Sequence, residues 1–272
     1  MRFQGYPRIM PKLAANVSML FAEVPFLERF AAAARAGFRA VEYQYPYEWK
    51  AADVAAAARD AGLEVILHNM PAGDPQLGER GTACLPGREG RFRDDLERAI
   101  EHAKPARCAS LHLMAGVVPP GAERAAYHAA YVANLRYAAQ RLGREGMRLF
   151  IEPLSERTVA NCFLRSSAQA AQILGEVAAD NALMQYDLFH MQIMEGNLAD
   201  TLERLLPRIG HLQLADVPGR NEPGTGEINF DFVLGHIDRI GYSGWIGCEY
   251  NPRGDTVEGL KWAQPYLRGK GK

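Results

Sequence analysis

Short β-type runs alternate with longer helix-type segments from Leu13 to Leu267, and this alternation limits the folds that the chain can adopt. Each apolar run of strand length is followed by an Ala-rich or amphipathic run, and Gly37 and Gly62 end the first two helical runs. Regular strand–helix repeats predict a parallel sheet covered by helices. The predicted strands are Leu13–Ser18, Phe38–Tyr43, Leu63–His68, Cys108–Met114, Met147–Pro153, Ala182–Asp187, Ile209–Leu214 and Trp245–Glu249. The predicted helices are Pro25–Ala36, Ala51–Ala61, Phe92–Ala103, Glu123–Leu142, Ser167–Val177, Asn197–Leu206, Asp231–Ile240 and Val257–Leu267.

Repeats of this kind in a chain of 272 residues favour closure into one (β/α)8 barrel, the TIM-barrel fold, over an open doubly wound sheet. No Ser- or Pro-rich linker divides the repeats, and no GxGxxG motif follows the first predicted strand, so a dinucleotide-binding domain is not expected. We expect a single barrel domain over residues 12–272. Residues 1–11 precede the pattern and are expected to form a flexible extension, with Met10 as an alternative start to Met1.

The composition argues against two classes of partner. The formal net charge is −1 and there is no block of like charges, so we expect no nucleic-acid partner. No window reaches the roughly 18 to 20 apolar residues that a membrane-spanning helix needs, so we expect no membrane partner. The four cysteines have no paired spacing, which favours reduced thiols in the cytoplasm. We therefore expect a cytoplasmic homo-oligomer that acts on a small molecule.

Polar side chains end several predicted strands, which is where a barrel of this kind carries its active site. Glu152, Asp187 and Glu249 end the fifth, sixth and eighth strands, and Gln213 lies near the end of the seventh. A solvated rim position or a helix N-cap would explain any one of these acids, but it explains three converging acids poorly. Burying a carboxylate is costly unless it is paired, and the neighbouring strand ends offer no Lys or Arg. We therefore predict a bound cation, and three carboxylates with one amide oxygen suit Mg²⁺ or Mn²⁺ better than Zn²⁺.

Histidines and one arginine complete the predicted site. We expect His68 and His190 to contact the substrate, and Arg220 to bind its negatively charged end. His112 lies within the fourth predicted strand, where it is either a site residue or a core histidine, and Glu42 is expected to orient its neighbours.

Several short motifs, taken together, are more specific than any single acid. They are the segments Ala15–Phe21, Val41–Tyr43, His68–Asp74, Gly78–Gly81, Ile151–Pro153, Gln185–Asp187, His190–Gln192, His211–Asp216, Glu222–Asn229 and Gly247–Tyr250. With these motifs the chain resembles the xylose-isomerase-like barrel superfamily and, within it, the hydroxypyruvate isomerase family. The resemblance covers the chain from Leu13 to Leu267.

This resemblance implies a ligand set and a reaction. The metal ligands of the family fall on Glu152, Asp187, Gln213 and Glu249, and the two glutamates are also its acid/base pair. The implied reaction interconverts hydroxypyruvate and 2-hydroxy-3-oxopropanoate (tartronate semialdehyde) in glyoxylate metabolism, by proton transfer through an enediolate. Sugar epimerases of the superfamily carry histidine at the position of Gln213, so the glutamine favours the hydroxypyruvate isomerase branch.

Three alternatives stay open at this point. A 2-oxotetronate isomerase would have the same ring of ligands, and a ketose 3-epimerase would use similar chemistry on neutral sugars. An abasic-site DNA endonuclease belongs to a different class. Abasic-site endonucleases of the superfamily bind zinc with additional histidines, which His68, His112 and His190 resemble. The Asp-x-His pair of those enzymes, however, is missing after Gln213.

Overall fold

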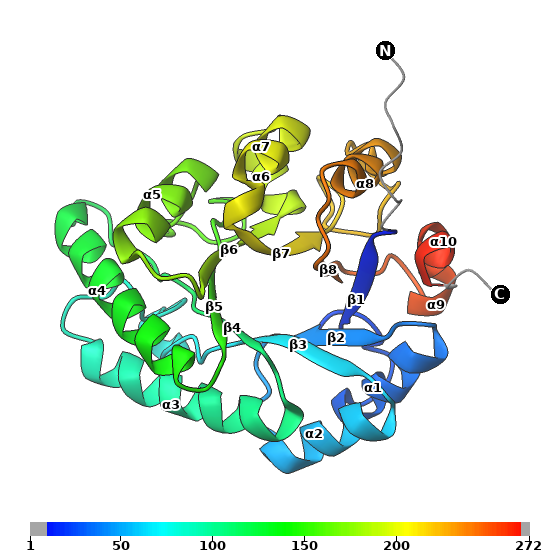
Figure 1. Ribbon diagram of the computed structural model, residues 1–272, viewed down its shortest axis with the longest axis horizontal. Coiled ribbons are helices and arrows are strands. Elements are labelled where there is room, and N and C mark those ends of the chain that lie inside the picture. The colour runs from blue at the N-terminus through cyan, green and yellow to red at the C-terminus, as the bar shows by residue number, and fades with distance from the viewer. Residues whose placement is uncertain (1–9, 268–272) are drawn as a thin grey trace.

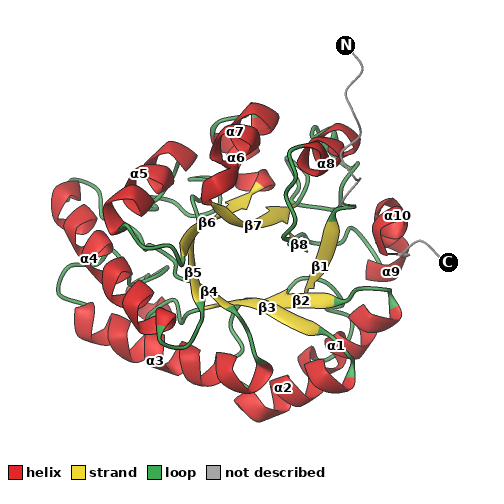
Figure 2. Cartoon of the chain, viewed as in Figure 1, coloured by secondary structure: helices red, strands yellow, loops and turns green. Residues whose placement is uncertain are grey.

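The computed structural model describes residues 10–267, which form a closed barrel of eight parallel strands surrounded by helices (Figures 1 and 2). The strands follow one another around the barrel in chain order, and β8 closes the barrel by pairing with β1. Their bounds are β1 Lys12–Asn16, β2 Ala40–Tyr43, β3 Glu64–Asn69, β4 Ser110–His112, β5 Arg148–Ile151, β6 Ala182–Asp187, β7 Ile209–Leu214 and β8 Trp245–Cys248. The predicted (β/α)8 barrel is confirmed. The extension predicted for residues 1–11 lies, as far as residue 9, outside the described residues.

The helices lie outside the barrel, as Figure 2 shows. They are α1 Phe26–Arg35, α2 Ala51–Asp60, α3 Glu89–Ala106, α4 Arg124–Gly143, α5 Ser167–Val177, α6 Leu188–Met194, α7 Leu198–Leu205, α8 Phe230–Arg239, α9 Thr256–Gly259 and α10 Gln264–Leu267. The helix predicted over Val257–Leu267 is interrupted, because a 3-10 turn at Leu260–Ala263 separates α9 from α10. Within residues 10–267, no helix has both the length and the apolar character required to cross a bilayer.

Helix α6 is an element that the sequence analysis did not predict. It follows β6 directly, and the side chain of Asp187 caps it by accepting a hydrogen bond from the backbone N–H of Phe189 at 2.8 Å. Its first turn is buried, so it lacks the polar face by which a surface helix is recognised in a sequence. The helix places His190 one turn beyond Asp187, on the same side of the barrel mouth.

Strand β3 contains an irregularity that decides which of its side chains face the barrel. Val41 pairs with Val65, but the next residue, Glu42, pairs with Leu67, so β3 has one extra residue in this ladder. Because successive side chains of a strand alternate between its faces, one extra residue inverts the alternation beyond it. The inversion affects His68 and Asn69, the last two residues of β3.

The barrel interior is apolar at one level and polar at another. Ala14, Ala40, Ile66, Leu67 and Phe150 form a small buried cluster, separate from the larger core between the strands and the helices. Buried polar side chains, in contrast, lie at or near the carboxyl ends of β1 to β8. The apolar level closes the barrel, and the polar level forms the candidate site at its mouth.

Asp216 organises the loop between β7 and α8. Its carboxylate accepts four backbone N–H hydrogen bonds, from Val217 and Ile228 on Oδ1 and from Gly224 and Gly226 on Oδ2, at 2.8–3.0 Å. The side chain is 1% exposed. This one carboxylate therefore fixes the shape of the loop that carries Arg220.

We predict that Asp216→Ala destabilises the fold strongly, because it leaves four backbone N–H groups without their acceptor, and those of Val217 and Ile228 are buried. Each buried donor without a partner costs about 1–3 kcal/mol, so we expect the free energy of unfolding to fall by about 2 kcal/mol or more. Urea denaturation would measure the loss, with Asp60→Ala as the control, because Asp60 is exposed and pairs with the exposed Arg59. A loss no larger than that of the control would contradict this role of Asp216.

Candidate active site

Three buried carboxylates lie at the mouth of the barrel. Glu152 directly follows β5, Asp187 ends β6 and Glu249 directly follows β8. Each is at most 6% exposed. Strands from different parts of the sequence thus bring together the three acids that the sequence analysis singled out.

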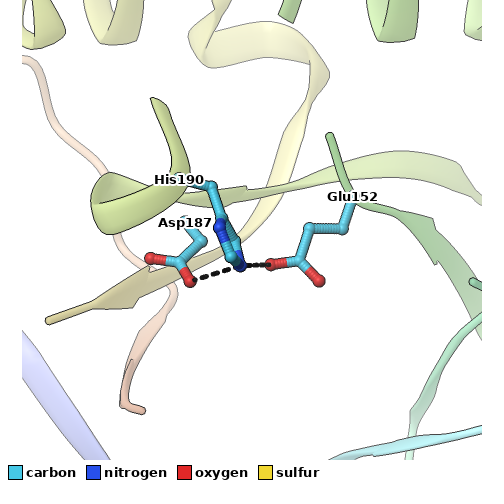
Figure 3. A group of neighbouring side chains, drawn as sticks. All are labelled: Glu152, Asp187 and His190. Atoms are coloured by element: carbon cyan, nitrogen blue, oxygen red, sulfur yellow. Dashed lines mark ion pairs between the residues drawn. The ribbon is translucent and has the colours of Figure 1, made fainter. Parts of the chain in front are cut away.

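Figure 3 shows two of these acids, Glu152 and Asp187, with the neighbouring His190. The Nε2 atom of His190 lies 3.5 Å from Asp187 Oδ2 and 4.0 Å from Glu152 Oε1. One possible ligand atom from each of the three residues lies within 4.8 Å of the other two. The two carboxylates of this group are close enough together to bind one cation.

Arg220 supplies a positive charge to the acids from a loop, not from a strand end. Its Nη2 atom donates to Glu249 Oε2 at 2.7 Å and lies 3.5 Å from Asp187 Oδ2. The guanidinium also lies 5.1 Å from the ring centre of Phe189. The neighbouring strand ends themselves carry no Lys or Arg, as the sequence indicates, and the positive charge comes from the loop after β7, which reaches back over the mouth. Arg220 lies where it could also meet an anionic substrate.

Two amides hold the carboxylate of Glu249 on its other side. Its Oε1 atom accepts hydrogen bonds from Gln44 Nε2 at 2.9 Å and from Asn16 Nδ2 at 3.2 Å. With Arg220 on Oε2, both oxygens of Glu249 are engaged. Glu249 is therefore held by donors from three different parts of the chain.

His190 presents an N–H group toward the acids. The backbone N–H of Ser155 donates to its Nδ1 atom at 3.4 Å, and the Ser155 hydroxyl lies 3.2 Å from the same atom. Because a backbone N–H can only donate, Nδ1 acts as the acceptor and the ring proton is assigned to Nε2. Burial lowers the pKa of His190 well below its ordinary value, so the ring is neutral. His190 thus suits hydrogen bonding to a substrate oxygen better than binding a cation.

His112 lies inside the site. Its Nδ1 atom lies 3.2 Å from Asn69 Oδ1, and its Nε2 atom lies 3.6 Å from Glu152 Oε2. Burial lowers the pKa of His112 to about 3. The ring is therefore a neutral neighbour of Glu152.

His68 faces away from the acids. Its ring stacks on Tyr43 with the centroids 5.7 Å apart, and burial lowers its pKa to about 4, with a further contribution from His102 of α3. The extra residue in β3 turns His68 toward the helices and Asn69 toward the barrel mouth. The predicted contact between His68 and the substrate is therefore not supported by this arrangement, because the side chain lies on the other side of the sheet.

Gln213 lies next to the acids but is held by other amides and by Glu42. It pairs with Asp187 in the β6–β7 ladder, its Oε1 atom accepts from Gln185 Nε2 at 2.6 Å, and its Nε2 atom donates to Glu42 at 2.7 Å. The structure thus groups Glu152 and Asp187 with His190, whereas Glu249 is bound to Arg220 and Gln213 to Gln185.

All three acids have raised pKa values. Burial raises the pKa of Glu152 well above its ordinary value, and the charges of Glu249 and Asp187 raise it further. Burial likewise raises the pKa of Asp187 to about 7, and it raises the pKa of Glu249. A loss of water and the mutual repulsion of the carboxylates therefore both favour the uncharged forms.

A divalent cation fits this donor set. Among residues 10–267, Glu152 Oε1 and Asp187 Oδ2 are buried atoms without a hydrogen-bond partner, and so is His112 Nε2. Two adjacent carboxylate oxygens of this kind are ligands that Mg²⁺ and Mn²⁺ prefer. Glu152 and Asp187 would hold the cation. Glu249 and Gln213 lie in the same site and are further candidate ligands.

Some residues of the site were missed by the sequence analysis. Asn16 ends β1, Asn69 ends β3, and Gln44 follows β2 directly. The rule that identified the acids, a polar residue at the end of an apolar strand, applies to these amides as well.

Residues 30–266 match the family described as xylose isomerase-like TIM barrel. The chain belongs to this family. A relative within it, the 2-oxo-tetronate isomerase of Pectobacterium atrosepticum, is 48% identical over 261 residues, which cover 96% of this chain and 100% of the relative. The hydroxypyruvate isomerase of Escherichia coli is 44% identical over 257 residues, which cover 94% of this chain and 100% of that protein.

A solved structure resembles the whole barrel closely. The crystal structure described as AP endonuclease, family 2, from Brucella melitensis superimposes with a TM-score of 0.92 at 42% identity, covering 94% of this chain and 99% of that chain. The isomerases of the family confirm the predicted resemblance, and the chain is an enzyme of the isomerase class.

We predict that Mn²⁺ stabilises chelator-treated protein more strongly in mildly alkaline than in mildly acidic buffer. The pKa of Asp187 is raised to about 7, so the folded metal-free protein holds a proton that the unfolded chain, with an ordinary carboxyl pKa of about 4, releases. The stability of the metal-free fold therefore falls as the pH rises through this range, and a cation in place of the proton restores it.

Thermal unfolding with and without Mn²⁺ at both pH values would measure this effect. Asp187→Asn should reduce the pH dependence, and Glu28→Gln, an exposed change on α1, should leave it intact. Equal shifts of the unfolding temperature in the two buffers, or no shift, would contradict a cation at these acids.

Proposed function

We propose that this chain is a divalent-cation-dependent isomerase that interconverts hydroxypyruvate and 2-hydroxy-3-oxopropanoate. The observation that carries this proposal is the pair of buried glutamates, Glu152 and Glu249, on either side of Asp187 and Arg220 at one barrel mouth. The hydroxypyruvate isomerase of Escherichia coli, 44% identical over its whole length, supports the same substrate.

The proposed reaction moves a proton between adjacent carbons. One glutamate removes a proton from the carbon that carries the hydroxyl group, which gives an enediolate. The hydroxyl proton passes to the former carbonyl oxygen, and the other glutamate returns a proton to the former carbonyl carbon, so that the hydroxyl and carbonyl groups exchange places. Glu152 and Glu249 exchange these roles in the reverse direction. Bound Mg²⁺ or Mn²⁺ would polarise the two substrate oxygens and offset their developing negative charge.

The other side chains position the substrate and protect the enediolate. His190 accepts from Ser155 at Nδ1, so its proton is on Nε2, from which it would donate to a substrate oxygen. Arg220 binds the carboxylate end of the substrate, and its contact with Phe189 limits the movement of the guanidinium. A positive charge at this place favours an acid over a neutral sugar as the substrate.

A second candidate substrate is a 2-oxotetronate, which is one carbon longer. The 2-oxo-tetronate isomerase of Pectobacterium atrosepticum, at 48% identity over its whole length, favours it. The same glutamates, histidine and arginine would serve this reaction. The two proposals therefore share their chemistry. They differ in the space that the site must provide for the substrate beyond the reacting carbons.

We predict that Glu249→Gln strongly slows the exchange of the substrate's carbon-bound proton with solvent. An amide cannot accept the proton, and loss of a positioned acid or base lowers rates by about 100-fold to 10,000-fold. Proton exchange in deuterated buffer, followed by NMR, measures this step directly. Glu258→Gln, at an exposed position on α9, serves as the matched control. Exchange at the native rate in Glu249→Gln would show that this glutamate is not an acid or a base.

We predict that a substrate panel separates the candidate functions. Hydroxypyruvate, a 2-oxotetronate and a neutral ketose would be assayed with Mg²⁺ and with Mn²⁺, and an oligonucleotide with an abasic site would be incubated under the same conditions. We expect turnover of the acids and none of the ketose, because only the acids carry a carboxylate that Arg220 can bind. The preferred acid decides between the two isomerases, whereas efficient turnover of the ketose or cleavage of the oligonucleotide would refute both.

A further inference from the structure

Glu42 lies beneath the acid cluster, inside the barrel. It is 1% exposed and belongs to β2. Its Oε1 atom accepts hydrogen bonds from Asn16 Nδ2 at 2.9 Å and from Gln213 Nε2 at 2.7 Å. Its Oε2 atom lies 2.6 Å from His211 Nε2. One carboxylate thus contacts side chains from β1 and β7 at the same time.

The backbone leaves room for this carboxylate. Gly247 on β8 lies beside it, and a Cβ atom at this position would overlap the carboxylate of Glu42. Asn16 pairs with Glu42 in the β1–β2 ladder, and Gln213 pairs with Gly247 in the β7–β8 ladder. Four strands therefore build the place that Glu42 occupies, and it is fixed by the register of the barrel.

The chemistry of Glu42 fixes the orientation of its neighbours. The oxygen and the nitrogen of an amide have almost the same shape, but a carboxylate accepts hydrogen bonds and does not donate them. The nitrogen of Gln213 must therefore face Glu42, and its oxygen must face the opposite way, where it accepts from Gln185. A carbonyl oxygen has two lone pairs, so one of them is left after this hydrogen bond.

Asn16 is oriented in the same way. Its nitrogen donates both to Glu42 and to Glu249 Oε1, and so links the buried carboxylate to the acid at the mouth. Glu42 thereby acts on two amides that border the acid cluster. A barrel interior needs no carboxylate at this depth for packing, because an apolar side chain avoids the cost of burying a charge.

We propose that Glu42 is a positioning residue that makes the oxygen of Gln213, and not its nitrogen, the atom available to a divalent cation. The inference rests on the proposed cation-dependent function. It assigns to Glu42 an indirect role, through the amide of Gln213, because Glu42 does not reach the mouth by any contact of its own with Asp187 or Glu152. Residues that orient a metal ligand in this way typically change metal affinity by about 10-fold to 100-fold when they are removed.

Exchanging the two side chains tests this inference. Gln213→Glu places a second carboxylate opposite Glu42, where Gln213 now lies 2.7 Å away. Without Glu42, a carboxylate at 213 should bind Mn²⁺ more tightly than an amide because it adds a negative charge. With Glu42 in place, we expect the opposite, a loss of Mn²⁺ affinity of about tenfold or more.

The reciprocal variant, Glu42→Gln combined with Gln213→Glu, restores a donor opposite an acceptor. We expect it to bind Mn²⁺ within about threefold of the wild-type protein, and Glu42→Gln alone completes a double-mutant cycle that gives the coupling between the two positions. Mn²⁺ affinity would be measured by calorimetry on chelator-treated protein, and the visible absorption spectrum of bound Co²⁺ would report the ligand set. Glu28→Gln is the matched control on α1.

Two results would overturn the inference. One is Mn²⁺ binding by Gln213→Glu that is as tight as in the wild-type protein or tighter. The other is a reciprocal variant that binds Mn²⁺ no better than Gln213→Glu, or that does not fold. If Gln213→Glu itself does not fold, the reciprocal variant still decides, because the inference requires it to fold and to bind. Wild-type protein that binds neither Mn²⁺ nor Mg²⁺ would instead refute the proposed function, which keeps the two failures distinguishable.

Discussion

Three carboxylates share the mouth of the barrel, and each has lost the water that stabilises its charge. Burial raises the pKa of Glu152, Asp187 and Glu249, and the acids also repel one another. A positive charge and several hydrogen-bond donors surround these acids. Arg220 contacts two of the acids, and two amides engage Glu249. The arrangement of loops and strand ends around the mouth follows from this need to hold charge away from water.

The scaffold and the site depend on each other through side chains that serve both. Asp187 caps α6 with one oxygen and turns the other toward the site, so the same carboxylate orients His190 and belongs to the acid cluster. Asp216 collects four backbone N–H groups and so fixes the loop that carries Arg220. Glu42 connects the register of β1, β2 and β7 to the orientation of the amides beside the acids. The strands thus determine where the site residues lie, and the buried carboxylates determine how the neighbouring side chains and loops are oriented.

The strand–helix pattern was sufficient to predict the barrel, because each element is long enough to show its own periodicity. The three acids were predictable together, since a rim position or a helix N-cap explains one acid at a strand end but explains poorly three that converge on one barrel mouth. Elements without such a pattern were missed. Helix α6 is short and its first turn is buried, and Asn16 and Asn69 are neutral side chains that strand ends carry for many reasons. His68 was misplaced because one extra residue in β3 inverts the faces of the strand.

The sequence by itself determined the order of the elements and the acids that end β5, β6 and β8, because both follow from local periodicity and from the geometry common to parallel barrels. The tertiary structure alone decided which groups meet. Arg220 and Glu249 are 29 positions apart in the sequence, and Glu42 and Gln213, which are hydrogen-bonded, are 171 positions apart. The outward direction of His68 depends on the shifted register of β3. Contacts of this kind leave no periodic trace in a sequence, since they depend on how the strands close into a ring.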